Sequence, residues 1–263
     1  MVYFCGMMSP KRPYNLKKSL GQHFLKDESV CRQIVDSVRQ FPVKQLLEIG
    51  PGGGAITKYF LTWQDIDFKA VEIDREKVAF LKKNFPALNG HLLEMDFLQM
   101  ERPFEGRFTI VGNFPYNIST EILFKVLEWR EQVEHVTGMF QKEVAQRIAA
   151  PAGNKIYGVT SVLLQAFFEV EWLFEVSEQA FNPPPKVKSA VIRLTPRTQG
   201  PNIESEKKFF LLVKTAFNQR RKTLRNAVKG LFTPEVLKDS LFDRRAEQLT
   251  LAEFAALTWR MGQ

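Results

Sequence analysis

The sequence is poor in the side chains that form disulfides and bind metals. Its 263 residues include only two cysteines, Cys5 and Cys31, and three widely separated histidines. Two cysteines cannot build a cysteine-rich metal site or a framework of several disulfides. The histidines also lack the spacing of zinc ligands. We therefore expect a protein that holds no metal.

Long apolar runs are also missing. No stretch approaches the roughly 18 apolar residues of a membrane-spanning helix. The opening Met-Val-Tyr-Phe-Cys-Gly-Met-Met lacks the basic start and long apolar core of a signal peptide. A content of 44% hydrophobic and 25% charged residues is ordinary for a soluble globular protein. We expect a cytoplasmic protein without membrane contact.

Positive charge is unevenly distributed along the chain. Residues 186–263 contain 16 Lys and Arg but 7 Asp and Glu, whereas the first 185 residues have a net charge of −1. Such a basic region is typical of a protein that binds a polyanion. A solvated basic surface without a partner explains the same charge.

Short apolar segments alternate with helical patterns through the first two thirds of the chain. This alternation is typical of β-α-β units on a parallel sheet, and the last two strands are expected to form an antiparallel edge. The expected strands are residues 45–50, 68–73, 91–95, 108–112, 133–140, 170–176 and 187–194. The expected helices are residues 28–39, 55–63, 75–84, 120–129, 143–150 and 159–168.

The pattern becomes purely helical from about residue 204, after a linker that contains Gly200 and Pro201. The chain is long enough for one large domain and a small second one. We expect a basic N-terminal arm over residues 1–26, an α/β domain over 27–197 and a small all-α domain over 203–263.

A glycine-rich turn follows the first expected strand. Gly50, Gly52 and Gly54 alternate with other residues and open a helix. Glycines let the backbone approach a ligand at the carboxyl edge of a parallel sheet. The spacing favours S-adenosylmethionine over NAD. A dinucleotide site stays open as an alternative, because Ala55 is compatible with its last position.

Acidic residues end the next two strands. Glu72 lies 22 residues after Gly50, where a carboxylate accepts hydrogen bonds from both ribose hydroxyls. Asp96 is placed to accept from the adenine amine of a cofactor. The structural alternatives are a surface carboxylate for Glu72 and a helix or turn cap for Asp96. Three such features at three successive strand ends together favour a nucleoside cofactor.

The tetrapeptide Asn113-Phe114-Pro115-Tyr116 follows the fourth strand and indicates the reaction. The exocyclic amine of adenine is a poor nucleophile, because its lone pair is delocalised into the ring. The Asn113 side-chain oxygen and the Phe114 carbonyl can accept its two hydrogens and stabilise the charge that develops during attack. Tyr116 offers a flat face for stacking of the base. A strand-terminating turn with a core tyrosine is the alternative.

With these residues the chain resembles the ribosomal RNA adenine dimethyltransferases, and most closely their small-subunit branch, which dimethylates two adjacent adenosines near the 3′ end of 16S rRNA. The resemblance runs from about residue 17 to the C-terminus. Its motifs are Lys18-Ser-Leu-Gly-Gln-His-Phe-Leu25, Leu47-Glu-Ile-Gly-Pro-Gly52, Val71-Glu-Ile-Asp74, Gly112-Asn-Phe-Pro-Tyr-Asn-Ile-Ser119, Gln141-Lys-Glu-Val-Ala-Gln-Arg-Ile148, Phe181-Asn-Pro-Pro-Pro-Lys-Val187 and Phe217-Asn-Gln-Arg-Arg-Lys-Thr-Leu-Arg-Asn226.

The resemblance implies a Rossmann-like class I S-adenosylmethionine-dependent methyltransferase domain followed by the small all-α domain. His23 and Leu25 would close over the cofactor from the N-terminal arm. His23 stands where many members have Asn, and Phe114 replaces the commoner Leu or Ile. The other implied cofactor contacts are Gly50, Gly52, Glu72, Asp96 and Asn113.

The resemblance also implies contacts with the RNA. Phe181, which precedes three prolines, would form the second half of a base clamp opposite Tyr116, unless it is a loop aromatic packed on the core. A basic cluster in the helical domain would lie on RNA phosphates without reading sequence, unless it is only a solvated charge run. The implied phosphate contacts are Lys17, Lys18, Arg220, Arg221, Lys222 and Arg225.

The resemblance therefore implies an enzyme of ribosome biogenesis that dimethylates the N6 amines of two adjacent adenosines in the 3′-terminal hairpin loop of 16S rRNA, within a precursor of the 30S subunit. We expect a monomer. A large-subunit (23S) rRNA methyltransferase of the macrolide-resistance type is one alternative. An RNA-binding assembly factor with dispensable catalysis is another. A DNA adenine methyltransferase usually begins the tetrapeptide with Asp. An NAD-dependent dehydrogenase is disfavoured by the glycine spacing and by the lack of a hydride-transfer acid.

Overall fold

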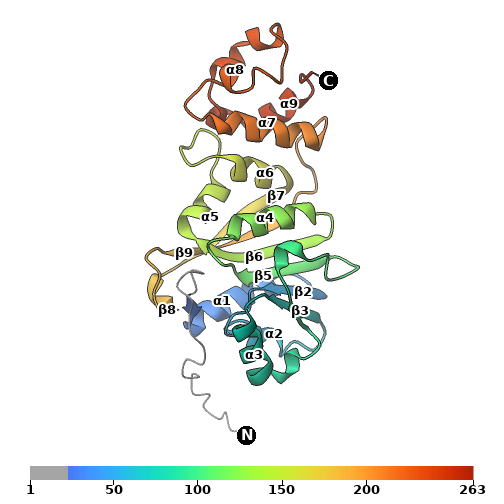
Figure 1. Ribbon diagram of the computed structural model, residues 1–263, viewed down its shortest axis with the longest axis vertical. Helices are drawn as coiled ribbons and strands as arrows, with labels where there is room; N and C mark the ends of the chain where they lie inside the picture. The colour runs from blue at the N-terminus through green and yellow to red at the C-terminus, as the bar shows by residue number, and fades with distance from the viewer. Residues whose placement is uncertain (1–22, 263) are drawn as a thin grey trace.

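A seven-stranded sheet forms the centre of the protein, which a computed structural model describes over residues 23–262. The strand order is β4-β3-β2-β5-β6-β9-β7 (Figure 1). All pairings from β4 to β6 are parallel, and β9 pairs antiparallel with both β6 and β7. The strands are β2 (Gln45–Ile49), β3 (Asp67–Glu72), β4 (Leu92–Glu94), β5 (Phe108–Asn113), β6 (Val133–Gln141), β7 (Phe168–Val176) and β9 (Ser189–Pro196).

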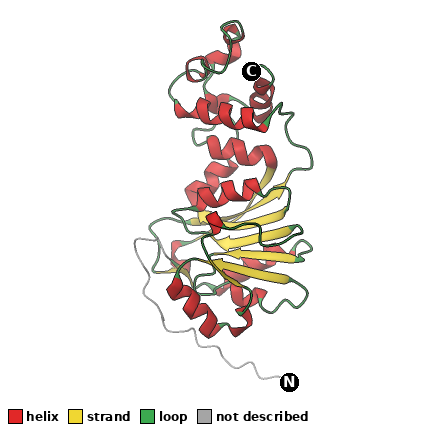
Figure 2. Cartoon of the chain, turned by 45° about the vertical axis from the view of Figure 1, so that its right-hand side comes forward, coloured by secondary structure: helices red, strands yellow, loops and turns green. Residues whose placement is uncertain are grey.

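Helices cover both faces of this sheet (Figure 2). They are α1 (Glu28–Arg39), α2 (Thr57–Phe60), α3 (Arg75–Asn84), α4 (Ser119–Glu128), α5 (Lys142–Ala149) and α6 (Val159–Phe167). Short 3₁₀ turns lie between them at Pro86–Leu88, Phe97–Gln99 and Glu178–Ala180. The α/β class expected from the sequence is confirmed. The expected arm residues Lys17 and Lys18 lie outside the described residues.

Alternate residues of each strand belong to two different core clusters. On β2, Leu46 packs in the cluster that includes α1, whereas Leu47 packs in the cluster that includes α4, α5 and α6. On β5, Val111 and Ile110 divide in the same way. Successive side chains of a strand point to opposite faces, and a parallel sheet needs cover on both. The sheet is therefore buried on both faces, and a ligand can reach it only at the ends of its strands, where the loops begin.

Helix α1 shows how local sequence fixes the ends of an element. The Asp27 carboxylate accepts hydrogen bonds from the N–H groups of Ser29 and Val30, which caps the first turn. The apolar residues Ile34 and Val38 then recur at helical spacing and are buried. Helix α2 is shorter than the expected 55–63, because the chain stays in turns until residue 56.

The C-terminal helices sit beyond the β7 edge, at the opposite end of the molecule from β4 (Figure 1). They are α7 (Glu206–Asn218), α8 (Leu224–Ala227) and α9 (Leu251–Thr258), with 3₁₀ turns at Val236–Lys238, Ser240–Asp243 and Ala246–Gln248. None of the helices within residues 23–262 is long and apolar enough to cross a membrane.

The core continues from the sheet into these helices. Phe209 of α7 is completely buried, and its ring centre lies 6.4 Å edge-to-face from that of Phe167 at the end of α6. Arg130 lies 4.7 Å from the Phe167 ring centre and donates to Glu206 at 2.5 Å. Both sides of the expected linker belong to one apolar cluster. The expected boundary between an α/β domain that ends at residue 197 and an all-α domain that begins at residue 203 stays a prediction.

We expect the sheet and the helical end to unfold together. Phe209→Ala removes a buried ring from the shared core and should lower the free energy of unfolding by about 3–5 kcal/mol. Urea unfolding followed by circular dichroism and by tryptophan fluorescence should give one coincident transition. The control is Leu211→Ala on the same helix, which is 48% exposed and should change stability by less than about 0.5 kcal/mol. Two separate transitions would contradict the shared core.

Candidate functional site

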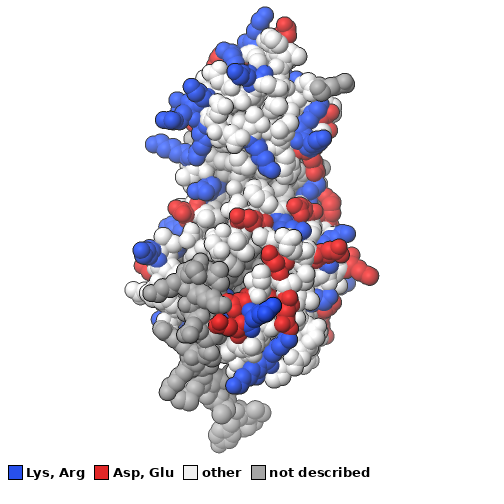
Figure 3. Space-filling model, in the orientation of Figure 1, with Lys and Arg blue, Asp and Glu red and all other residues white. Residues whose placement is uncertain are grey.

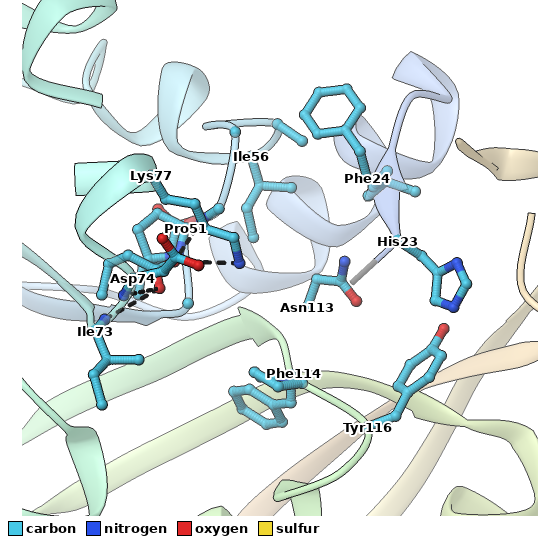
Figure 4. Close-up of a pocket in the computed structure, with 18 of the residues that line it drawn as sticks. His23, Phe24, Pro51, Ile56, Ile73, Asp74, Lys77, Asn113, Phe114 and Tyr116 are labelled. Carbon is cyan, nitrogen blue, oxygen red and sulfur yellow. Dashed lines mark hydrogen bonds and ion pairs between the residues drawn. The ribbon is translucent and has the colours of Figure 1, made fainter. Parts of the chain in front are cut away.

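A pocket opens at the carboxyl ends of β2, β3 and β5, where the strand order reverses (Figure 4). Such a reversal is where open α/β sheets bind ligands. Residues from four distant segments line the pocket. The expected site residues among its lining are His23, Leu25, Gly50, Gly52, Glu72, Asn113, Phe114, Pro115 and Tyr116. Asp96 and Phe181 are not in the lining.

The glycine turn forms one wall and needs glycine for its backbone. Gly50, Gly52 and Gly54 have φ angles of +68°, +58° and +78°, a region that residues with a side chain avoid. A Cβ on Gly54 would also lie 2.4 Å from the ring of Phe85. At Gly50 and Gly52, which line the pocket, a ligand therefore meets backbone rather than a side chain.

Glu72 ends β3 and holds the glycine turn. Its carboxylate accepts from the N–H of Gly52 at 3.2 Å and from those of Ile73 and Asp74 at 3.1 and 3.0 Å. The Lys77 ammonium lies 3.9 Å away. Glu72 is only 5% exposed, so the alternative of a surface carboxylate is wrong. Two carboxylate oxygens offer about four acceptor positions, and an additional hydroxyl can therefore be bound.

Asp96 has the cap geometry named as its structural alternative. Its carboxylate accepts from the Leu98 N–H at 2.9 Å and begins the 3₁₀ turn Phe97–Gln99. This contact explains why an acidic residue stands between β4 and the turn that follows it. Its contact with a cofactor amine stays a prediction, which would use the remaining acceptor positions of the carboxylate.

The side chains of the tetrapeptide at the end of β5 point in different directions. Asn113 is half-buried at the pocket, whereas the Phe114 ring points into the core and is 1% exposed (Figure 4). The Phe114 N–H donates to the carbonyl of Met139 at 3.2 Å, which continues the pairing with β6 beyond the end of β5. The backbone of the tetrapeptide is thus fixed to the neighbouring strand.

Tyr116 lies with its ring in the wall of the pocket. Its hydroxyl is 2.6 Å from the Ser189 hydroxyl, which is completely buried at the start of β9. Burial raises the pKa of Tyr116, and the hydrogen bond with Ser189 opposes this shift. The His23 ring centre lies 6.0 Å from that of Tyr116, and His23 Nδ1 is 2.9 Å from the carbonyl of Pro183. Tyr116 is therefore a pocket residue rather than a core tyrosine.

Phe181 lies differently from the expected clamp. It belongs to the two-residue strand β8 (Phe181–Asn182), which pairs antiparallel with β1 (Phe24–Leu25). Its ring is 1% exposed and packs in the cluster that contains Leu25. In this arrangement Phe181 has no open face for a base, as in the alternative of an aromatic packed on the core. Its role as the second half of a clamp stays a prediction that requires the ring to be uncovered.

Glu48 and Ile73 line the pocket and were not singled out from the sequence. Glu48 is 1% exposed, and its Oε2 has no hydrogen-bond partner among the described residues. Burial raises its pKa to about 8; the nearby Thr57 hydroxyl opposes the shift, and the charge of Glu72 adds to it. Ile73 is 64% exposed, which is unusual for an apolar side chain. The available signal for Glu48 was an acidic residue between two apolar residues of β2.

The four basic residues expected on the helical domain have different surroundings. The Arg220 guanidinium donates to the carbonyls of Lys155 and Tyr157, at 2.5 and 3.4 Å. Arg225 donates to the Leu237 carbonyl at 2.9 Å and pairs with Asp243. The remaining two, Arg221 and Lys222, are exposed. Lys and Arg side chains gather over this end of the molecule (Figure 3).

Comparison with known proteins gives the same family in several ways. A family model described as ribosomal RNA adenine dimethylase matches residues 14–258. The ribosomal RNA small subunit methyltransferase A of Cytophaga hutchinsonii is 52% identical, over 92% of this chain and 95% of that protein. Its counterpart in Bacteroides thetaiotaomicron is also 52% identical, over 92% of each chain.

Solved structures share the fold. A dimethyladenosine transferase from Plasmodium falciparum superposes with a TM-score of 0.72 at 24% identity, over 88% of this chain and 94% of that one. The 23S rRNA methyltransferase ErmE gives a TM-score of 0.66 at 24% identity, over 89% and 99%. At this identity the likeness establishes the Rossmann-like fold alone.

The buried Glu48 should make stability depend on pH. Its pKa of about 8 in the folded state lies above the value near 4.3 of an unfolded chain. The folded protein therefore holds the proton longer, and stability falls as the pH rises from about 4.3 to 8. Glu48→Gln removes this loss, so the variant should gain about 2–4 kcal/mol over the wild type between pH 5 and pH 8.5 in urea unfolding.

Glu101→Gln is the matched control, because it makes the same chemical change at an exposed position. Its stability should follow the wild-type dependence on pH. Equal slopes for wild type and Glu48→Gln would show that the Glu48 carboxyl is not held protonated by burial.

Proposed function

The chain belongs to the ribosomal RNA adenine dimethylase family, and from that premise we propose that it dimethylates the N6 amines of two adjacent adenosines in the 3′-terminal hairpin loop of 16S rRNA. Relatives named as small-subunit methyltransferases are about half identical to it over more than nine tenths of both chains. The observation that carries the proposal is the acceptor tetrapeptide beside the glycine turn in one pocket. We place its action in the cytoplasm, as a monomer acting on a precursor of the 30S subunit.

The pocket fits S-adenosylmethionine. Glu72 would hold the ribose hydroxyls, and the exposed Ile73 offers an apolar surface to the flat adenine. The buried Oε2 of Glu48, which has no partner among the described residues, suits the positive charge of the methionine end. When bound, S-adenosylmethionine supplies a methyl group already activated on a positively charged sulfur.

Asn113 and Phe114 perform the chemistry on the acceptor side. The Asn113 oxygen and the Phe114 carbonyl accept the two hydrogens of the adenine amine and draw its lone pair out of the ring. Acceptors fixed in advance stabilise the developing charge without reorganising during the reaction. Phe114 is held by its hydrogen bond to Met139, so its carbonyl is fixed in this sense.

The remaining residues present the base. Stacking on Tyr116 contributes about 1–3 kcal/mol, and the hydrogen bond with Ser189 keeps the ring in place. Extraction of the target base from its stack costs a few kcal/mol, which is least in a loop or an unfinished subunit. We assign Arg221 and Lys222, together with Lys17 and Lys18, to the RNA phosphates. Arg220 and Arg225 would contribute to RNA binding in part by holding the loops whose carbonyls they bind.

The substrate is tested by transfer of labelled methyl from S-adenosylmethionine to 30S particles that lack this methylation. We expect label as dimethyladenosine in the 16S rRNA, because the small-subunit relatives are about twice as similar in sequence as ErmE. The parallel controls are 50S particles and naked DNA. Label confined to 50S particles would assign the large-subunit activity. A lack of transfer to all three would leave an RNA-binding assembly factor.

The acceptor role is tested by Asn113→Ala. Loss of one of the two acceptors should lower the rate of methyl transfer by about 10²–10³-fold, the range for a preorganised polar group at a developing charge. Binding of the RNA, measured by filter retention, should stay within about twofold. Asn89→Ala, at an exposed position away from the pocket lining, should keep both properties. Joint loss of transfer and RNA binding would count against the role of Asn113.

A further inference from the structure

Two glycines lie opposite each other on the neighbouring strands β5 and β6. Gly112 on β5 and Gly138 on β6 are register partners. Neither has the positive φ angle that marks the glycines of the pocket turn. The backbone at these positions accepts any residue, and glycine inside a strand is unfavourable because it loses more conformational freedom on folding. Such glycines mark a close approach of another group.

The approaching group is the ring of Phe114. A Cβ on Gly112 would lie 2.7 Å from Phe114 Cε1, and a Cβ on Gly138 would lie 2.5 Å from Phe114 Cε2. The Cβ on Gly138 would also lie 2.6 Å from Cε2 of Phe140. The two edges of one ring thus lie over the two glycines. Phe140 closes the space from the side, with its ring centre 5.1 Å away at an angle of 72°. The ring is almost completely enclosed and has little room to shift.

The position of this ring determines the position of the reacting backbone. Phe114 carries the proposed acceptor carbonyl and directly follows Asn113, the other proposed acceptor. A ring displaced by a new side chain beneath it would move both acceptors. Displacement of a reacting group by about 1 Å can cost about 10²-fold in rate.

We propose that Gly138 is a positioning residue for methyl transfer, because the space above it seats the Phe114 ring and thereby orients the two acceptors. The proposal rests on the proposed function and adds to it a residue of the neighbouring strand. Positions 114 and 138 then form a size-matched pair, in which phenylalanine at one requires glycine at the other.

The test is Gly138→Ala, assayed on 30S particles. We expect kcat to fall about 10–100-fold, while binding of S-adenosylmethionine, measured by calorimetry, stays within about twofold. Adding Phe114→Leu keeps the backbone carbonyl and removes one of the two rings that clash. It also leaves space into which the second ring, Phe140, can move, because Phe140 packs against Phe114. The double variant should therefore recover to within about threefold of the Phe114→Leu single variant.

Gly112→Ala is the matched control. Its new Cβ would lie 2.6 Å from the backbone carbonyl of Ile49 as well as against the Phe114 ring. Because that carbonyl remains, Phe114→Leu should not rescue Gly112→Ala. Rescue at position 138 and none at 112 is the result expected from the paired packing.

Other outcomes overturn the proposal. These are an unchanged kcat for Gly138→Ala, a failure of Phe114→Leu to restore it, or equal rescue of both alanine variants. If Gly138→Ala does not fold, recovery of folding in the double variant supports the pair, and failure of both counts against it. An inactive wild type would refute the proposed function instead. The pair would then be judged by the same pattern of rescue in thermal unfolding.

Discussion

The parallel pairing of β2 with β5 is the constraint on which the rest of the structure depends. Both strands end at the same edge of the sheet, and their register sets Glu48 beside Val111. The glycine turn and the acceptor tetrapeptide are therefore adjacent, although about sixty positions separate them in sequence. A Cβ on Gly50 would lie 3.6 Å from the ring of Pro115. One backbone ladder thus brings a cofactor-binding turn against an acceptor turn.

Contacts from outside this pair complete the site. The start of β9 supplies Ser189 to Tyr116, and the turn after β8 supplies the Pro183 carbonyl to His23. The short pairing of β1 with β8 joins these segments over the pocket. Glu48 and Glu72 are both buried in the pocket lining, and two carboxyl groups suit a positively charged ligand better than a phosphate. The helical end of the molecule has the opposite charge and suits the RNA backbone.

Periodicity and turn chemistry were sufficient to predict the sheet, its parallel part and the pocket residues at the ends of β2, β3 and β5. His23 and Leu25 came only from the family resemblance. The patterns were insufficient where a contact with a residue distant in sequence determines the position of a side chain. Phe181 is covered by its pairing with β1, about 160 positions away. Glu48 was hidden in a strand where both of its neighbours in sequence are apolar. The glycine at position 138 looked unremarkable, because its neighbour is a ring on another strand.

The continuous core between the sheet and the C-terminal helices has a geometric consequence. Phe209 and Phe167 pack together without an intervening hinge, so the exposed Arg221 and Lys222 keep a constant separation from the pocket. An RNA held at those cations would present whichever nucleotide lies at that separation along its folded path. The protein would then select its adenosines by their distance from a bound phosphate. Contacts with the neighbouring bases would not be required.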